Sequence, residues 1–320
     1  MAEKKHSAFA LLNILQELTD EKHILSAGQL MKLLHERYNL NIERRTLYSN
    51  IDILRQAGYE ISDFNDNGKG YYLISRQFEK GEVLLLCNAI HASHFINQKQ
   101  SDDLINKLLA TLPMTARREF KDSVYLPNRL KQESPMLFYN IEVISEAIRE
   151  RKQLRFLYTH YGKNGKPAAK RKEPYIVEPR YIVYAEGRPY LIVTSHHPGF
   201  GHYRIDRIKD PFVMEEPVRP FRKADETEAY KYAENKLFMF AGDEITVTYR
   251  CEDRIMDSLI DLLGKDIRPF SQEDGFFYLK VSTTEKGALF LAQQFIDAIE
   301  ITEPASLRET MKEILKKRYQ

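Results

Sequence analysis

The sequence predicts a multidomain α+β protein, and three observations lead to this fold class. Its 320 residues are enough for two or three domains of ordinary size. Apolar residues recur at helical spacing in residues 7–58, whereas short β-prone runs separated by turn residues dominate residues 154–214. Residues 240–320 alternate between strand and helix patterns. Each of these regions is long enough to bury a core of its own.

Composition and charge narrow the class of protein. Hydrophobic residues make up 43% of the chain and charged residues 29%, which is typical of a folded protein. The net charge is only +2, so any nucleic-acid binding must come from local patches. The N-terminal run lacks the pattern of a signal peptide, and no later run is apolar enough to span a membrane, so we expect a cytoplasmic protein with no membrane contact. Cys87 and Cys251 are far apart in sequence and are predicted to fill cores.

The first 58 residues predict a bundle of three short helices. One covers residues 7–19, and a second follows Ser26, a residue type that caps helix N-termini. A third begins near Asn41, places Leu47, Ile51 and Leu54 on one face, and ends at Gly58. Two β-prone runs then flank NDNGKG, where Asn-Gly is a strong hairpin signal. Helices followed by a hairpin predict a winged helix-turn-helix over residues 1–78.

The polar face of the third helix is a candidate DNA-binding surface. In a helix-turn-helix, the N-terminal part of the second helix of the motif reads base edges in the major groove. Arginine can form a bidentate hydrogen bond with guanine and asparagine with adenine, while hydroxyl groups can donate hydrogen bonds to phosphates. A lysine at the hairpin tip would contact the adjacent backbone. The candidates are Arg44, Arg45, Thr46, Tyr48, Ser49, Asn50 and Lys69. The alternative is an ordinary solvated face, in which Glu43 and Asp52 balance the arginines.

Three further regions follow this domain. Residues 79–135 read as helices with apolar spacing and form a helical connector. Residues 136–222 contain one helix and several closely spaced strands, which suggests a small antiparallel barrel. Residues 240–320 form an α+β unit that is similar to a ferredoxin-like fold.

The run HYRIDRIKD contains two arginines whose roles depend on strand geometry. A regular strand puts Tyr203 and Arg207 on one face, and Arg204 and Asp206 on the other. Arg204 then pairs with Asp206 in a structural salt bridge, and Arg207 is left for an anionic partner. A bulge would reassign both arginines.

Three runs of the predicted barrel resemble the WYL domain of bacterial transcription regulators. They are FLYT at Phe156–Thr159, RPYLIV at Arg188–Val193 and HYRIDRI at His202–Ile208. The N-terminal RRTLYxxIDxL pattern and the C-terminal IEITEPASLR resemble the flanking domains of the same regulators, the latter a WCX-type extension. The resemblance covers nearly the whole chain.

The resemblance implies an Sm-like β-barrel that senses a ligand, often a nucleotide or nucleic acid, and signals to the DNA-binding domain. Arginine suits phosphate, and tyrosine offers a base a stacking face and a hydroxyl group. The residues implied in effector binding are Tyr158, Tyr190, Ser195, His197, His202, Tyr203, Arg204 and Arg207. The tryptophan that names the motif is replaced by Pro189, which offers no aromatic ring for stacking.

The chain lacks the sequence motifs of the main enzyme classes. It has no Walker-type phosphate loop, no GxSxG serine and no cysteine motif with a catalytic base. We therefore expect no catalytic residue, no metal and no cofactor. The predicted function is a DNA-binding transcription regulator, acting as a homodimer on double-stranded DNA and responding to an anionic effector. The alternatives are a nucleic-acid-binding adaptor without operator specificity, or a nucleic-acid-processing enzyme, which would require clustered carboxylates for Mg²⁺.

Overall fold

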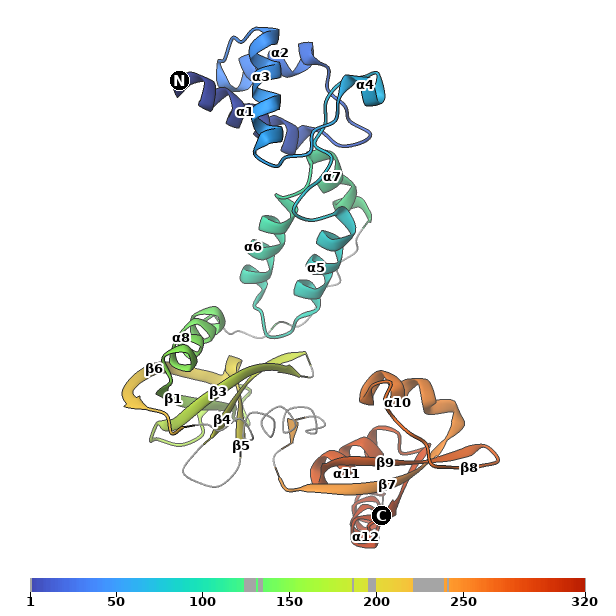
Figure 1. Cartoon of the computed structure of the whole chain (residues 1–320). Helices are drawn as coiled ribbons and strands as arrows, with labels where there is room; N and C mark the ends of the chain where they lie inside the picture. Colours follow the sequence, from blue (N-terminus) through green and yellow to red (C-terminus); the bar gives the residue numbers. More distant parts are fainter. Residues whose placement is uncertain are drawn as a thin grey trace. The chain divides into compact units, whose positions relative to one another are not determined.

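The computed structural model shows a mixed α+β chain in two compact units, Met1–Pro135 and Met136–Gln320 (Figure 1). It describes residues 2–123, 131, 135–185, 187–194, 200–220, 239–240 and 242–319. Within that part of the chain, no helix has the length and apolar character that crossing a membrane requires.

The N-terminal region is a cluster of helices around an aliphatic core. Its helices are α1 (Ala2–Leu18), α2 (Ala27–Tyr38) and α3 (Arg44–Gln56). Ser26 caps α2 as predicted, because its hydroxyl accepts from the backbone N–H of Gln29 while the Gln29 side chain accepts from that of Ser26. Each helix turns its apolar face inward, and the core includes Leu11, Leu15, Leu30, Leu34, Leu47 and Ile51.

The predicted hairpin after α3 differs from expectation. The flanking runs form one isolated antiparallel bridge, Ile61 with Leu73, and Tyr71 forms a second bridge with Leu25, which precedes α2. Between them lies a one-turn helix, α4 (Phe64–Asn67), in place of a two-residue Asn-Gly turn. The Asp66 carboxylate accepts from the backbone N–H of Asp63, which starts the helical turn. Local capping therefore overrides the Asn-Gly signal.

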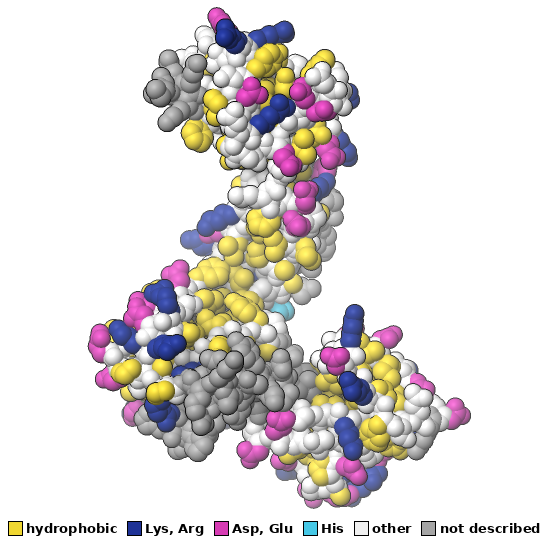
Figure 2. Space-filling view, in the orientation of Figure 1, with side chains coloured by type: hydrophobic (Ala, Val, Ile, Leu, Met, Phe, Trp, Pro, Cys, Tyr) yellow, Lys and Arg dark blue, Asp and Glu magenta, His cyan; other side chains and the backbone are white. Residues whose placement is uncertain are grey.

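The region predicted as a connector contains three helices, α5 (Lys80–Ala92), α6 (Gln98–Leu109) and α7 (Met114–Ser123). Val83 and Cys87 of α5 are buried against Ile105 and Leu109 of α6. In contrast, Leu85 is 71% exposed and Leu86 is 38% exposed. Figure 2 shows hydrophobic side chains on the surface of this region.

The second unit opens with α8 (Leu137–Glu150), which packs on a curled antiparallel sheet that forms a half-barrel (Figure 1). The sheet order is β2-β1-β3-β4-β5, and β6 pairs with β1. The strands are β1 (Lys152–Tyr161), β2 (Pro167–Ala169), β3 (Tyr175–Ala185), β4 (Arg188–Thr194), β5 (Phe200–Arg204) and β6 (Ile208–Pro217).

The run HYRIDRI does not form one regular strand. A 3-10 turn, Ile205–Arg207, separates β5 from β6. The buried Asn140 side chain on α8 donates to the carbonyls of Ile205, at 3.2 Å, and Ile208, at 2.8 Å. These bonds satisfy carbonyls that a continuous strand would have paired with another strand. The turn removes Arg207 from the two-residue alternation.

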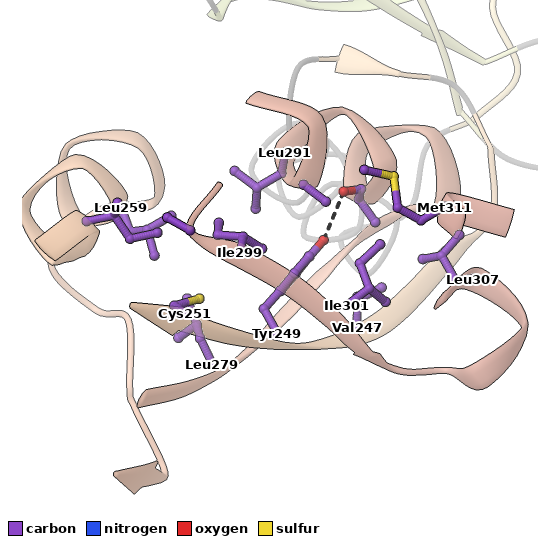
Figure 3. Packing of buried hydrophobic residues seen from close by; sticks show 14 of the residues in the cluster. Val247, Tyr249, Cys251, Leu259, Leu279, Leu291, Ile299, Ile301, Leu307 and Met311 are labelled. Atoms are coloured by element: carbon purple, nitrogen blue, oxygen red, sulfur yellow. Dashed lines mark hydrogen bonds between the residues drawn. The ribbon is translucent and has the colours of Figure 1, made fainter. Parts of the chain in front are cut away.

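The C-terminal region is a four-stranded antiparallel sheet with helices, in the order β10-β7-β9-β8. Its elements are β7 (Glu244–Glu252), α10 (Met256–Leu263), β8 (Ser271–Glu273), β9 (Phe276–Thr284), α11 (Glu285–Gln294), β10 (Ile299–Glu303) and α12 (Ala305–Tyr319). Figure 3 shows residues of its core, in which the Tyr249 hydroxyl donates to the carbonyl of Ala288 at 3.3 Å. Cys251 is buried here, as expected, and burial raises its pKa to about 12.

Candidate DNA interface and effector site

The N-terminal half of α3 presents a polar, exposed face. Arg44, Arg45, Tyr48 and Ser49 are exposed, and Thr46 is half-buried. The Tyr48 ring lies 6.3 Å from the Tyr71 ring, which holds it against the following segment. The opposite face of α3 is anchored in the core. This half of the helix therefore stands out from the bundle with its side chains accessible.

Asn50 does not share this face. Its side chain is 1% exposed and donates to the Ser7 hydroxyl of α1 at 3.0 Å. This position contradicts the prediction that Asn50 reads a base, because a base edge cannot reach a side chain in the core. The sequence contained a signal for this, since Asn50 follows Leu47 by three residues and precedes Leu54 by four, the spacing of the buried stripe.

Lys69 is exposed on the loop that follows α4, and the loop is held by side chains. The Asn67 side-chain oxygen accepts from the backbone N–H of Lys69 at 2.7 Å and of Gly70 at 2.8 Å. On α3, Arg55 donates to the carbonyls of Ile61 and Ser62. Arg55 therefore stabilises the segment before α4, whereas Asn67 holds the backbone from which Lys69 projects.

Four aromatic rings form a cluster on one face of the curled sheet. The Tyr203 ring of β5 lies 5.1 Å from the rings of both Phe156 and Tyr158 on β1, and 5.3 Å from the ring of Tyr175 on β3. The Arg171 guanidinium stacks 3.6 Å above the Tyr175 ring. The prediction included Tyr158 and Tyr203. It missed Tyr175 and Arg171, whose place here depends on strand pairing. It also missed Phe156, which lies two residues before Tyr158 on the same strand and so shares its face.

The two arginines of the 3-10 turn region have different environments. Arg204 pairs with Asp206 through two bonds of 3.0 and 2.6 Å, and the side chains are 11% and 2% exposed. The structural role considered for Arg204 is therefore observed. The Arg207 guanidinium carries a buried Nε atom with no hydrogen-bond partner, and its centre lies 6.0 Å from the Tyr161 ring. A buried donor of this kind gains from an acceptor supplied by a ligand.

Tyr158 connects these arginines to the aromatic cluster. Its hydroxyl oxygen accepts from the backbone N–H of Arg204 at 3.1 Å, which ties β1 to β5. Burial raises the pKa of Tyr158, while that hydrogen bond and the positive charges of Arg207 and Arg204 act in the opposite direction. The hydroxyl group stays protonated at neutral pH and can donate a hydrogen bond.

Tyr190 and His202 lie on the opposite face from Tyr203. Strand register pairs Tyr190 with Arg204 and Ile192 with His202, whereas Leu191 pairs with Tyr203. The Tyr190 ring is 6% exposed and packs with Ile192. The eight predicted effector residues therefore do not form one cluster. Ser195 and His197 fall outside the residues that the structure describes.

Comparison with protein families identifies the domain that carries this cluster. Residues 139–213 match the family model described as the WYL domain. The chain contains a WYL domain. Pro189, which replaces the first residue of the WYL motif, is buried near the start of β4, opposite Tyr184. The proline thus adds to packing in the WYL domain.

Two solved structures are similar to the chain at low identity. Proteasome accessory factor B/C (PafBC) of Arthrobacter aurescens has 16% identity and a TM-score of 0.29, over 97% of this chain and 47% of that chain. The chain thus spans about half the length of that protein. A structure described as a CRISPR Cas-related protein has 13% identity and a TM-score of 0.37, over 74% of this chain and 70% of that chain. No curated protein matches the sequence.

The curled sheet also contains a buried ionic network where β3 pairs with the end of β4. Glu178 on β3 is 2% exposed and accepts from Arg180 at 2.9 Å, from Thr194 at 2.9 Å and from Arg219 at 2.8 Å. Burial by itself raises the pKa of Glu178, but the hydrogen bonds from Arg219 and Thr194 outweigh it, and the net pKa is lowered. Arg180 in turn donates to the carbonyl of Arg219 at 3.2 Å. The network joins β3, β4 and the segment after β6.

No group of three or more His, Cys, Asp or Glu side chains suited to hold a metal ion occurs within the described ranges.

Proposed function

We propose that the protein is a sequence-specific transcription regulator. In this proposal α3 lies in the major groove of duplex operator DNA, and the WYL domain senses an anionic effector, either a nucleotide or single-stranded nucleic acid. The observation that carries it is the face of α3 formed by Arg44, Arg45, Tyr48 and Ser49, which is exposed on a helix anchored by its other side. Major-groove recognition requires this arrangement.

The segment after α3 supports a winged form of the helix-turn-helix. Lys69 is exposed on the loop after α4, whose backbone donates two hydrogen bonds to the Asn67 side chain, and Arg55 holds the segment before α4. A lysine in this position suits a phosphate of the DNA backbone, where it positions the protein without reading sequence. Thr46 adds a hydroxyl group at the edge of the face. Asn50 is left out of the interface because it is buried.

Replacement of Arg45 by alanine tests the proposal directly. We expect Arg45→Ala to weaken operator binding by about 1–3 kcal/mol and to flatten sequence preference, because a bidentate arginine contact is worth that much discrimination. Purified protein is incubated with fragmented genomic DNA across a salt series, and the retained fragments are sequenced. The wild-type protein should enrich a paired motif.

Lys99→Ala is the matched control, because Lys99 is an exposed cation on α6, away from α3. It should leave both the affinity and the enriched motif unchanged. Equal enrichment by Arg45→Ala and by the wild type would contradict the assignment of α3. Retention of fragments without any enriched motif would favour an adaptor that binds nucleic acid non-specifically.

The aromatic cluster and Arg207 form the effector site in this proposal. The curled sheet would act as an Sm-like barrel, in which Tyr158 and Tyr203 contact a base and Arg207 contacts a phosphate. The buried Nε atom of Arg207 without an acceptor supports this role. An arginine beside aromatic rings combines charge with stacking, as sites for bases and phosphates require. Tyr190 and His202 would affect the site only from the other side of the sheet.

Arg207→Ala should leave operator affinity intact in the absence of effector and abolish the effector's influence. The measurement titrates individual nucleoside monophosphates into the protein bound to a fluorescent operator duplex and records release or tightening. Arg155→Ala is the control, because Arg155 is an exposed arginine that lies over Phe212, away from the cluster. A response that survives in Arg207→Ala would refute the effector-site assignment.

The proposed regulator acts as a homodimer and needs no catalysis. Exposed Leu85 and Leu86 on α5 offer an apolar surface for a second copy, and a paired motif in the retained DNA would match a two-fold protein. The effector would shift the placement of the WYL domain relative to α3. The free energy by which the effector shifts the equilibrium between the two arrangements can be no larger than the difference between its binding free energies for them.

A further inference from the structure

The start of α8 holds the turn that carries Arg207. Asn140, in the first turn of α8, is 1% exposed, and its side chain donates to the carbonyls of Ile205 at 3.2 Å and of Ile208 at 2.8 Å. From the sheet, the Thr159 hydroxyl of β1 donates to the Arg207 carbonyl at 2.9 Å. The backbone on both sides of Arg207 is therefore bound to α8.

The same helix begins two residues after Pro135, the last residue of the first unit. The Asn140 backbone N–H donates to the Met136 carbonyl at 2.8 Å, which closes the first turn of α8. Met136 occupies the N-cap position, and its side chain forms no capping hydrogen bond. The first turn of a helix depends on such caps, because its N–H groups have no partner within the helix. The position of Asn140 therefore depends on how the chain is held just before α8.

The chain before α8 is attached to the junction of α5 and α6. The Gln100 side chain of α6 donates to the Pro135 carbonyl at 3.1 Å. Lys131 is attached close by, where a cation is favoured by the dipole at the C-terminal end of α5. Its ammonium group donates to the carbonyls of Ile90 and Ser93 and to the hydroxyl of Ser101, at 3.0, 2.9 and 2.9 Å. Pro135 therefore leaves the first unit from a fixed point.

Three residues along this route have polar atoms that lack partners. In the described part of the chain, Gln100 Oε1, Asn140 Oδ1 and Arg207 Nε are buried without a hydrogen-bond partner. Such an atom costs free energy, because it has lost its bond to water and gained none in the protein. We therefore expect a second arrangement, with better partners for these atoms, to lie close in free energy.

We propose that the first turn of α8 is a relay that couples the turn carrying Arg207 to the bond between Gln100 and Pro135. When Arg207 Nε gains an acceptor, the turn shifts, Asn140 follows it, and the change in the first turn of α8 alters the hold on Pro135. Coupling is reciprocal, so weakening the Gln100 bond loosens the Arg207 turn. The use of the relay rests on the proposed effector site, but the coupling itself is measured without an effector.

The test is hydrogen exchange of the full-length protein, measured by mass spectrometry on two variants. Gln100→Ala removes the bond to Pro135, and we expect exchange of residues 205–208 to become about twofold to tenfold faster, although these residues are far away in the sequence. Asn140→Leu removes both bonds to the turn, and we expect exchange of residues 100–105 to become faster by a similar factor.

Gln98→Ala is the matched control for Gln100→Ala. Gln98 lies on the same helix, and its side chain donates to Asp102 within α6 at 2.8 Å. This variant should leave exchange of residues 205–208 as in the wild type. Equal exchange of residues 205–208 in the two glutamine variants would overturn the relay, since the turn would not depend on the hold on Pro135.

Thr159→Val is the control for Asn140→Leu. It removes a bond to the same turn from β1 and leaves α8 unchanged. Exchange should therefore become faster in residues 205–208 but not in residues 100–105. If Thr159→Val and Asn140→Leu changed residues 100–105 equally, α8 would not be the route, and the relay would be wrong.

A further measurement separates the relay from the proposed effector site. Nucleoside monophosphates are added to the wild type in the same exchange experiment. Coupled exchange in the variants without a response to any nucleotide would support the relay and contradict the effector site. A response to a nucleotide without coupled exchange in Gln100→Ala would overturn the relay and leave the effector site in place. If Asn140→Leu does not fold, Gln100→Ala decides by itself, because Gln100 is only partly buried.

Discussion

Replacing Glu178 by glutamine is expected to destabilise the WYL domain by about 3–5 kcal/mol, the cost of breaking a buried ion pair by removing one partner. Arg180 is 9% exposed and would keep its charge in the interior without the carboxylate. Thr194 and Arg219 would lose an acceptor in the same step. Chemical denaturation followed by circular dichroism measures the loss, and hydrogen exchange of residues 175–194 locates it.

The pH dependence of the Glu178 effect has a definite sign. The folded-state pKa of Glu178 lies below its ordinary value of 4.5, so its charge stabilises the folded state fully above that pH. This stabilisation is lost as the pH falls through the lowered folded pKa. The difference between wild type and Glu178→Gln should therefore shrink under acid conditions.

Glu215→Gln serves as the control for Glu178→Gln. Glu215 lies on β6 of the same sheet, and its side chain is 95% exposed, with only a 3.6 Å contact to Lys152. An exposed pair of this kind contributes little, so stability should change by less than about 1 kcal/mol. If the two variants were equally stable, the buried network would not hold the sheet together.

Replacing Gly70 by alanine is expected to destabilise the N-terminal region by about 3 kcal/mol, because the added methyl group overpacks against backbone. A Cβ atom at this position would lie 2.2 Å from the carbonyl oxygen of Leu25. The backbone of Leu25 also forms both hydrogen bonds of the bridge to Tyr71, so the clash cannot be relieved by a side-chain rotation. The φ angle of +156° adds strain for any residue with a Cβ atom.

Thermal unfolding and hydrogen exchange of residues 59–75 would measure the Gly70 effect. Gly28→Ala is the control, because Gly28 lies near the start of α2 with no atom within 4 Å of the added Cβ. It should keep or slightly raise the stability, since alanine favours helix. Arg45 remains exposed in both variants, so reduced DNA binding by Gly70→Ala alone would link the loop to the position of α3. Unchanged stability of Gly70→Ala would mean that the bridge between Leu25 and Tyr71 is not formed.

Much of the fold could be predicted because it depends on local patterns. Spacing and capping at Ser26 located α2, and β-prone runs between turn residues located most strands of both sheets. The structure of the segment after α3 could not be predicted in the same way. Asp63 and Asp66 cap a helical turn there, whereas Asn-Gly favours a tight two-residue hairpin turn. Two local signals competed there, and the sequence offered no measure of which was stronger.

Tertiary contacts determined where most residues of the candidate site lie and whether they are exposed. Asn50 was expected to be accessible, but packing of α1 supplies Ser7 as its partner and buries it. Arg207 lies outside the regular strands because the Asn140 side chain on α8 donates to the carbonyls of Ile205 and Ile208, which a continuous strand would pair with another strand. Each of these contacts joins residues more than forty positions apart, beyond the range of any periodicity.

The sequence by itself determined the order of the longer helices and strands and the exposed arginines of α3, and it pointed to the short-range partnership of Arg204 with Asp206. Only the tertiary structure separated Tyr190 from Tyr203 and added Tyr175 and Arg171 to the aromatic cluster. The physical reason is that alternation fixes which residues share a face within one strand. Which residues meet across strands depends on register and sheet order, and these follow from packing of the whole domain.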